Sequence, residues 1–162
     1  MSREIDALRW LAGFPVSERV GQVLRRASDY ACRRHHEYIG TEHLLAGLVA
    51  EKDGVAAAVL QHLQIDSDKV IDRLNAAVKM GSTDRGSGAV LPYTSRAKKA
   101  LELAREEARS LWHGYLGTEH LLIGLLAEKN GVGAQVLGEF GASVDVVRTE
   151  TQRILGPSPG GA

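Results

Sequence analysis

The stretch GTEHLLAGLVAEKDGV, residues 40–55, returns 77 residues later as GTEHLLIGLLAEKNGV, residues 117–132. Between residues 40–59 and residues 117–136, 15 of 20 positions are identical. This level of identity at a constant offset indicates an internal duplication. The chain therefore contains two copies of one structural unit, and each feature of one copy has a counterpart in the other.

The repeated stretch predicts a helix with a broad apolar face. Its leucines follow helical spacing in both copies: Leu44, Leu45 and Leu48, and Leu121, Leu122 and Leu125. Thr41 and Thr118 are predicted to be its N-caps. A glycine lies near the middle of each helix, Gly47 and Gly124, where it costs about 1 kcal/mol relative to alanine. Because both copies accept this cost, we expect a close approach between helices at these glycines.

Three further helices are predicted in each copy. Hydroxyl N-caps, Ser17 and Thr94, start the first one, which extends in copy one to about Arg34. Gly54 and Gly131 are predicted to end the repeated helix as left-handed C-caps. A third helix is predicted at 55–63 in copy one and at 132–140 in copy two. A fourth is predicted to start at Asp66 or Ser67 in copy one and at Ser143 in copy two, where Val147 and Leu155 should face inward.

No segment shows the alternating pattern of a strand, so we predict an all-α protein. Two tandem four-helix repeats are expected to pack as one pseudo-twofold, eight-helix domain, because one copy alone would form a thin core. The predicted organisation is an N-terminal extension with an extra short helix (1–13), repeat one (14–81), a linker (82–92), repeat two (93–156) and a disordered tail (157–162).

Charge and composition exclude several classes of function. The 162 residues carry 20 Lys+Arg and 20 Asp+Glu, and the two halves are each neutral. Such a chain lacks the basic surface that nucleic acid or an anionic membrane requires. No apolar run is long enough to span a membrane, and the N-terminus lacks the apolar core of a signal peptide. We therefore predict a cytoplasmic protein without nucleic-acid or membrane partners.

Metal, cofactor and catalytic motifs are weak. His35, His36, Glu37 and His43 resemble a ligand cluster, but the second copy replaces His35 by Trp112 and Glu37 by Gly114. A bend in the chain is the favoured interpretation, with no metal site and no cofactor. The single cysteine, Cys32, is predicted to be a buried structural thiol. The local basic groups, which include Arg25, Arg26, Arg33 and Arg34, are interpreted as a solvated helix face.

Taken together, the repeated motifs resemble the Clp repeat domain, the N-terminal domain of the ClpC, ClpA and ClpB unfoldases, with the tandem arrangement closest to ClpC. The motifs that carry this resemblance are a hydroxyl–x–Arg before the first helix, Gly-Thr-Glu-His-Leu-Leu-x-Gly-Leu, Gly-Val-Ala, and Tyr-Thr-x-Arg-Ala-Lys-Lys at 93–99. The resemblance covers residues 14–156. It implies a non-catalytic module that docks protein substrates or adaptors of ATP-dependent proteolysis, or the Clp ATPase itself.

In that family the domain precedes AAA+ ATPase modules. The chain contains no Gly-x-x-x-x-Gly-Lys-Ser/Thr motif, so we expect it neither to hydrolyse ATP nor to act as an enzyme. The resemblance thus leaves two possibilities. One is a docking module, excised or stand-alone. The alternative is a stand-alone decoy or regulator that sequesters Clp substrates or ligands away from the full-length unfoldase.

The resemblance further implies one phosphoarginine pocket per repeat. Carried over by position, the first pocket involves Ser17 and Glu42, and the second involves Thr94 and Glu119. A helix N-terminus attracts the phosphate, and a carboxylate suits the guanidinium. This pairing requires the first two helix N-termini of a repeat to lie side by side. The competing interpretation is that Thr-Glu at a helix start serves only as a cap.

Overall fold

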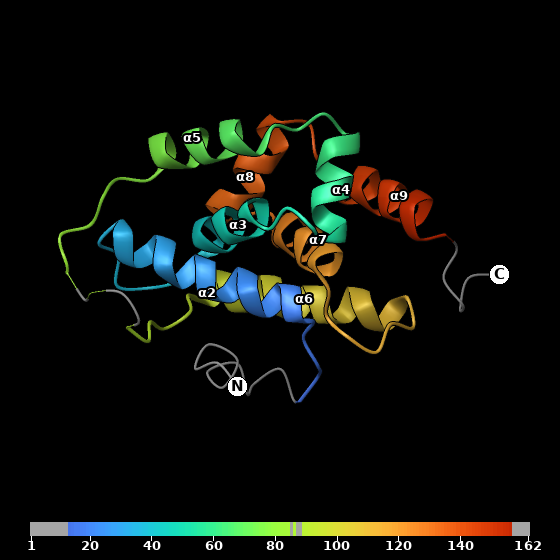
Figure 1. Ribbon diagram of the computed structural model, residues 1–162, viewed down its shortest axis with the longest axis horizontal. Helices are drawn as coiled ribbons and strands as arrows, with labels where there is room; N and C mark the ends of the chain where they lie inside the picture. Colours follow the sequence, from blue (N-terminus) through green and yellow to red (C-terminus); the bar gives the residue numbers. More distant parts are fainter. Residues whose placement is uncertain (1–12, 85, 87–88, 157–162) are drawn as a thin grey trace.

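The computed structural model describes residues 13–84, 86 and 89–156, in which eight helices follow one another without a strand (Figure 1). These helices are α2 (Glu18–Arg33), α3 (Thr41–Ala50), α4 (Val55–His62), α5 (Ser67–Ala77), α6 (Ser95–Ser110), α7 (Thr118–Glu128), α8 (Val132–Glu139) and α9 (Val144–Leu155). None of them is long and apolar enough to cross a membrane. The predicted all-α duplication is confirmed. The predicted extra helix and the tail fall on residues outside the described ranges.

Side-chain caps set the helix starts that the sequence predicted. The N–H of Val20 donates to Ser17 Oγ over 3.1 Å at the start of α2, and the N–H of Ala97 donates to Thr94 Oγ1 over 3.1 Å at the start of α6. Asp66 caps α5 and Ser143 caps α9 in the same way. Each cap satisfies a backbone donor that the first turn leaves without a partner.

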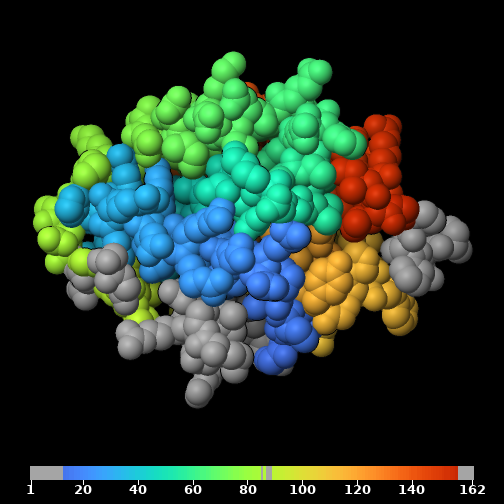
Figure 2. Space-filling model, in the orientation of Figure 1, coloured from blue at the N-terminus to red at the C-terminus, as the bar shows by residue number. Residues whose placement is uncertain are grey.

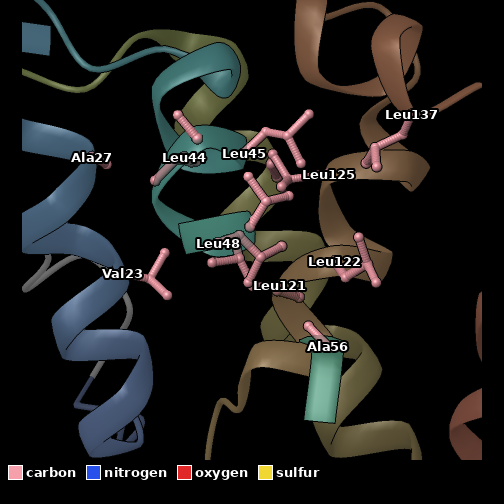
Figure 3. Packing of buried hydrophobic residues seen from close by; sticks show 14 of the residues in the cluster. Val23, Ala27, Leu44, Leu45, Leu48, Ala56, Leu121, Leu122, Leu125 and Leu137 are labelled. Atoms are coloured by element: carbon pink, nitrogen blue, oxygen red, sulfur yellow. The ribbon is translucent and has the colours of Figure 1, made fainter. Parts of the chain in front are cut away.

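The two copies of the repeated stretch, α3 and α7, form the centre of the molecule. Every residue of α3 except Ala50 is buried, and every residue of α7 except Ala127 is buried. A helix that is buried all round needs apolar side chains on all faces, and beyond the Thr-Glu-His of the first turn both helices are mainly apolar. Leucines from α3 and α7 meet there, with α8 on the far side (Figure 3).

Gly47 and Gly124 mark the closest helix crossings. A Cβ atom at Gly47 would overlap the carbonyl oxygen of Val23 on α2. A Cβ atom at Gly124 would likewise overlap the carbonyl oxygen of Ala100 on α6. The backbones of α2 and α3, and of α6 and α7, therefore approach too closely for a side chain at either glycine, which confirms the predicted role of both glycines.

The two repeats interlock instead of forming separate bundles. Helix α4 packs on α7 and α9, and α5 packs on α8 as well as on α3, so the third and fourth helices also have neighbours in the other copy. Two polar contacts span these interfaces at pseudo-equivalent positions, a hydrogen bond between His62 and Glu150 at 2.9 Å and an ion pair between Arg73 and Glu139 at 2.7 Å. Leu91, in the predicted linker, is also buried in the shared core. The result is one pseudo-twofold body.

The sequence prediction was wrong for the two glycines before the third helices and for Leu155. Gly54 and Gly131 have φ values of −82° and −76°, so they are not left-handed C-caps but the N-caps of α4 and α8. A Cβ at Gly54 would lie 2.6 Å from the hydroxyl of Thr118 in the other copy, which is why glycine is needed there. Leu155, predicted to face inward, is 44% exposed because α9 ends at the surface.

Candidate functional site

The segments that precede α2 and α6 cross to the opposite repeat. The N–H of Ser17 donates to Leu116 O over 3.0 Å, and the N–H of Leu116 donates to Pro15 O over 2.8 Å. The same exchange occurs in the other half, where Thr94 N–H donates to Ile39 O over 3.0 Å. In Figure 2 the start of α2, in dark blue, meets the orange surface of the second copy. These bonds place each helix start against the other repeat's Gly-Thr-Glu-His motif.

The pairing of Ser17 with Glu42 is therefore wrong, as is that of Thr94 with Glu119. Helix α2 has 16 residues and is about 24 Å long. Ser17 caps its start, whereas the start of α3 lies near its end, with the rings of Tyr30 and His43 5.9 Å apart. A short bend joins the end of one helix to the start of the next. The two helix starts of one repeat must then lie far apart.

Ser17 instead shares a pocket with Glu119. The pocket has a volume of about 550 Å³ and lies between the start of α2, the start of α7 and the segment before α4. Its lining residues are Ser17, Glu18, Arg19, Gln22, Asp53, Val55, Tyr115, Gly117, Thr118 and Glu119. The lining residues numbered up to Val55 belong to repeat one, and those from Tyr115 onward belong to repeat two. The site is composite, and it contains one hydroxyl N-cap and one repeated glutamate.

The carboxylate of Glu119 is unusually enclosed. Glu119 is 1% exposed, and its Oε1 atom accepts no hydrogen bond from any residue that the structure describes. Burial raises the pKa of this carboxyl above its ordinary value. A Cβ at Gly117 would overlap Oε1, so the glycine allows the carboxylate to fold back over the backbone. A buried carboxylate oxygen without a donor favours a ligand that brings its own N–H groups.

A histidine pair holds the backbone beneath this carboxylate. His120 Nδ1 accepts from Gly117 N–H over 2.8 Å, and His120 Nε2 lies 2.7 Å from His113 Nδ1. Since Nδ1 accepts a hydrogen bond, the neutral ring carries its proton on Nε2 and donates it to His113. Burial lowers the pKa of His120 to about 4. The ring is therefore neutral near pH 7 and cannot neutralise Glu119.

The hydroxyls of Thr41 and Thr118 do not cap their own helices, which corrects the sequence prediction. Thr118 Oγ1 accepts from Ala56 N–H over 3.1 Å, and Thr41 Oγ1 accepts from Gly133 N–H over 3.2 Å. Each threonine thus caps the third helix of the other repeat. At the starts of α3 and α7, the N–H of the N-cap glycine, Gly40 or Gly117, donates instead to the ring of His43 or His120. The hydrogen bonds of the fold thus explain why Thr and His recur in both copies. They do not explain why Glu42 and Glu119 recur.

The second composite site is placed by the pseudo-twofold relation. Thr94 lies against the Ile39–Gly40 segment, as Ser17 lies against Leu116–Gly117. Glu42 follows this segment, is 9% exposed, and also has a pKa raised by burial. The sites therefore pair Ser17 with Glu119 and Thr94 with Glu42. The four predicted residues remain the four candidates, with their partners exchanged.

The two sites differ in charge. The first is lined by the acidic Glu18, Asp53 and Glu119 and one basic residue, Arg19. At the corresponding positions the second has only one acidic residue, Glu42, and two basic ones. The replacements, read from the first site to the second, are Glu18 by Ser95, Gln22 by Lys99 and Asp53 by Asn130. The sequence analysis did not identify Glu18, Gln22 and Asp53 as neighbours of the site. Aligning the two copies at their offset of 77 residues would have revealed the charge differences at these positions.

Other candidate chemistry finds no support in the described part of the chain. No group of three or more His, Cys, Asp or Glu side chains among the described residues is arranged to hold a metal ion. His36, one of the suspected ligands, instead contacts His43 Nε2 over 2.7 Å through its Nδ1 atom. Cys32 is buried, and burial raises the pKa of its thiol, so it is not an activated nucleophile.

Comparison with known proteins agrees with this fold. The family described as the Clp repeat (R) N-terminal domain matches residues 15–111 and again residues 92–161. The ATP-dependent Clp protease ATP-binding subunit ClpC of Staphylococcus aureus (strain USA300) is 42% identical over 141 residues, which cover 87% of this chain and 17% of that protein. The chain thus spans about a sixth of the length of this curated relative.

Solved structures show the same arrangement. The N-domain of ClpV from Vibrio cholerae is 15% identical and superposes with a TM-score of 0.75 over 98% of this chain and 93% of that one. A ClpV N-domain in complex with a VipB peptide is 14% identical, with a TM-score of 0.69 over 96% and 92% of the two chains. These structures support the fold alone. With the family match and the ClpC identity, they show that the chain belongs to the Clp repeat N-terminal domain family.

Proposed function

We propose that the chain is a docking module of a Clp-type ATPase, which holds protein substrates or adaptors and does not transform them. The observation that carries this proposal is the composite pocket that joins Ser17 to Glu119. A site formed from the start of one helix and a buried glutamate of the other repeat is suited to recognising a polar side chain. The ClpV N-domain solved with a VipB peptide supports a peptide partner.

The chemistry of each pocket suits phosphoarginine. The first turn of α2 leaves backbone N–H groups without intrahelical partners, and a helix N-terminus attracts an anion. The guanidinium of Arg19 lies beside the same turn, 3.9 Å from Asp53. Across the pocket, Glu119 offers a carboxylate to the guanidinium of the ligand. A phosphate on one side and a guanidinium on the other match these two halves of the site.

The two sites should not bind this ligand equally. Phosphoarginine is net negative, and the second site carries three more positive formal charges than the first at matched positions. These side chains are exposed, so each changes the affinity only by a factor of about two to three. We therefore expect the Thr94–Glu42 site to bind about tenfold more tightly at low salt. The difference should shrink as salt screens the charges.

Calorimetry with a peptide that contains one phosphoarginine tests this proposal. The protein should bind two peptides with unequal affinity, and Glu42→Gln and Glu119→Gln should each remove one of the two events. Glu106→Gln, on the exposed face of α6, is the matched control and should leave both. No binding by the unmodified protein, or equal binding of the unphosphorylated peptide, would reject phosphoarginine as the ligand.

The internal duplication supplies a sharper test of the unequal affinities. The triple variant Glu18→Ser, Gln22→Lys, Asp53→Asn gives the first site the residues of the second. Its weak binding event should strengthen about tenfold at low salt, while the stronger event remains unchanged. An unchanged weak event would show that the charge difference does not set the affinities, although both sites would still bind phosphoarginine.

A further inference from the structure

A second hollow, of about 570 Å³, lies between α2, α3 and α5. Its apolar lining includes Ala46, Ala50 and Ile71. It reaches Arg33 at the end of α2, whereas the pocket described above lies at the start of that helix. The three helices adjoin on the face shown in Figure 2. This hollow is therefore a separate surface, and its residues take no part in the proposed phosphoarginine sites.

Arginines border the hollow, and two of them are held in place by helix ends. One amino group of Arg26 donates to Ala50 O, the last carbonyl of α3, over 2.5 Å. One amino group of Arg34 donates to Val78 O over 2.5 Å and to Asn75 O over 3.3 Å, at the end of α5. A guanidinium has five N–H donors, so both retain donors for a ligand. Cations at helix C-termini are also favourably placed.

The third arginine, Arg33, is exposed and has no hydrogen bond or ion pair with any residue that the structure describes. Asp29 is the one acidic side chain in the lining of this hollow. Three guanidiniums against one carboxylate give the border of an apolar hollow a net positive charge. That combination is complementary to a ligand with both acidic groups and an apolar group.

The duplicate copy carries larger or ion-paired side chains at the matched positions. Ala46 corresponds to Ile123, a larger side chain that is 2% exposed. Tyr30 and Ile71 correspond to Glu107 and Arg148, which form a two-bond ion pair of 2.8 and 3.0 Å. Repeat one has a small residue and no such ion pair at these positions. The side chains that line the hollow are thus particular to this copy.

We propose that this hollow binds an acidic peptide segment of a protein partner, with one apolar side chain between two carboxylates. Arg26 and Arg33 are seven residues apart on α2, which corresponds to about 10.5 Å along the helix. In an extended peptide, alternate side chains share a face, and residues i and i+4 lie about 13 Å apart. Carboxylates at i and i+4 then reach the two arginines, and an apolar residue at i+2 enters the hollow.

Fluorescence anisotropy with a labelled probe peptide, Gly-Glu-Ser-Leu-Ser-Glu-Gly, tests this proposal. The probe should bind saturably, and replacing its leucine by serine should weaken binding about tenfold, since the apolar side chain is no longer buried. The matched peptide with lysine in place of both glutamates should not bind. Equal binding of the leucine and serine peptides, or displacement of the probe by inorganic phosphate, would indicate a small-anion site and overturn the proposal.

Protein variants locate the binding surface. Arg33→Gln should weaken the probe about threefold at low salt, whereas Arg25→Gln, exposed on the same helix but outside the hollow, should not. Tyr30→Glu with Ile71→Arg installs the ion pair of the second copy and should abolish binding, with the circular dichroism spectrum retained. Equal losses in Arg33→Gln and Arg25→Gln would overturn the proposal. Glu119→Gln should leave this binding intact, which separates it from the phosphoarginine sites.

Discussion

Replacing Gly47 by alanine gives a prediction in which two physical effects have opposite signs. Gly47 lies inside α3, and alanine is favoured over glycine in a helix interior by about 1 kcal/mol. If helix propensity decided the outcome, Gly47→Ala would stabilise the protein. The contact with α2 predicts the reverse, so the sign of the change alone distinguishes the two effects.

The magnitude follows from what the new methyl group meets. Its carbon would overlap the carbonyl oxygen of Val23 and lie 3.0 Å from the backbone N of Ala27. Both are backbone atoms, which no rotamer change can move away. Helix α2 must shift, although its inward face is packed in the core. Overpacking of this kind costs about 1–3 kcal/mol or more. After the gain in propensity is subtracted, we expect a net loss of about 2 kcal/mol.

Urea denaturation followed by circular dichroism measures this loss. The free energy of unfolding should fall by about 2 kcal/mol, which corresponds to a Tm about 4–8 °C lower for a domain of this size. Gly138→Ala is the matched control, because Gly138 is exposed on α8 and a methyl group there would have no neighbouring atom within 4 Å. That variant should gain up to about 1 kcal/mol. A Gly47→Ala protein as stable as the unmodified one would refute the reasoning.

Three further changes probe the interlocked core and the surface. Thr118→Ala leaves the first turn of α4 without its buried acceptor and should cost about 1–2 kcal/mol in urea unfolding, whereas Thr118→Ser should cost less. Acidification should destabilise the protein through His43 and His120, whose native pKa values of about 3 and 4 lie below the ordinary 6.5. At these two rings the unfolded state binds more protons below pH 6.5, so their contribution to stability, present above that pH, is lost as pH falls towards 4, by up to about 1.4 kcal/mol per pH unit for each ring. The raised pKa values of Glu42 and Glu119 act in the opposite direction. Unfolding at successive pH values measures that slope, and ¹⁵N shifts that show either ring charged at pH 5.5 would contradict it. Removing the exposed Arg73–Glu139 ion pair by Arg73→Gln should change stability by less than about 1 kcal/mol, and a larger loss would mean that the contact between α5 and α8 depends on it.

Much of the architecture could be predicted from the sequence because the signals are local or periodic. Ser17, Thr94 and Ser143 are N-caps in the structure, since a hydroxyl before an amphipathic run acts within three residues of itself. The duplication and the broad apolar face of the two leucine-rich helices followed from identity and spacing. The role of Gly47 was predicted from its recurrence in the middle of both copies.

The errors concern residues whose partners lie in the other repeat. Thr41 and Thr118 were expected to cap their own helices, but their hydroxyls accept from Gly133 and from Ala56, 92 and 62 residues away in sequence. Gly54 was expected to end a helix, but it makes room for the Thr118 methyl and hydroxyl groups. Local rules assign such residues a local role, since no nearby residue signals the distant contact.

The sequence by itself determined that two copies of one helical unit exist and where most helices begin. The family resemblance proposed Ser17, Glu42, Thr94 and Glu119 as the candidate residues of the site. Only the tertiary structure decided how they pair. A helix of 16 residues separates its two ends by about 24 Å, so Ser17 cannot reach the glutamate that follows it in its own repeat. The exchange of the segments before α2 and α6 across the pseudo-twofold axis brings it instead to Glu119.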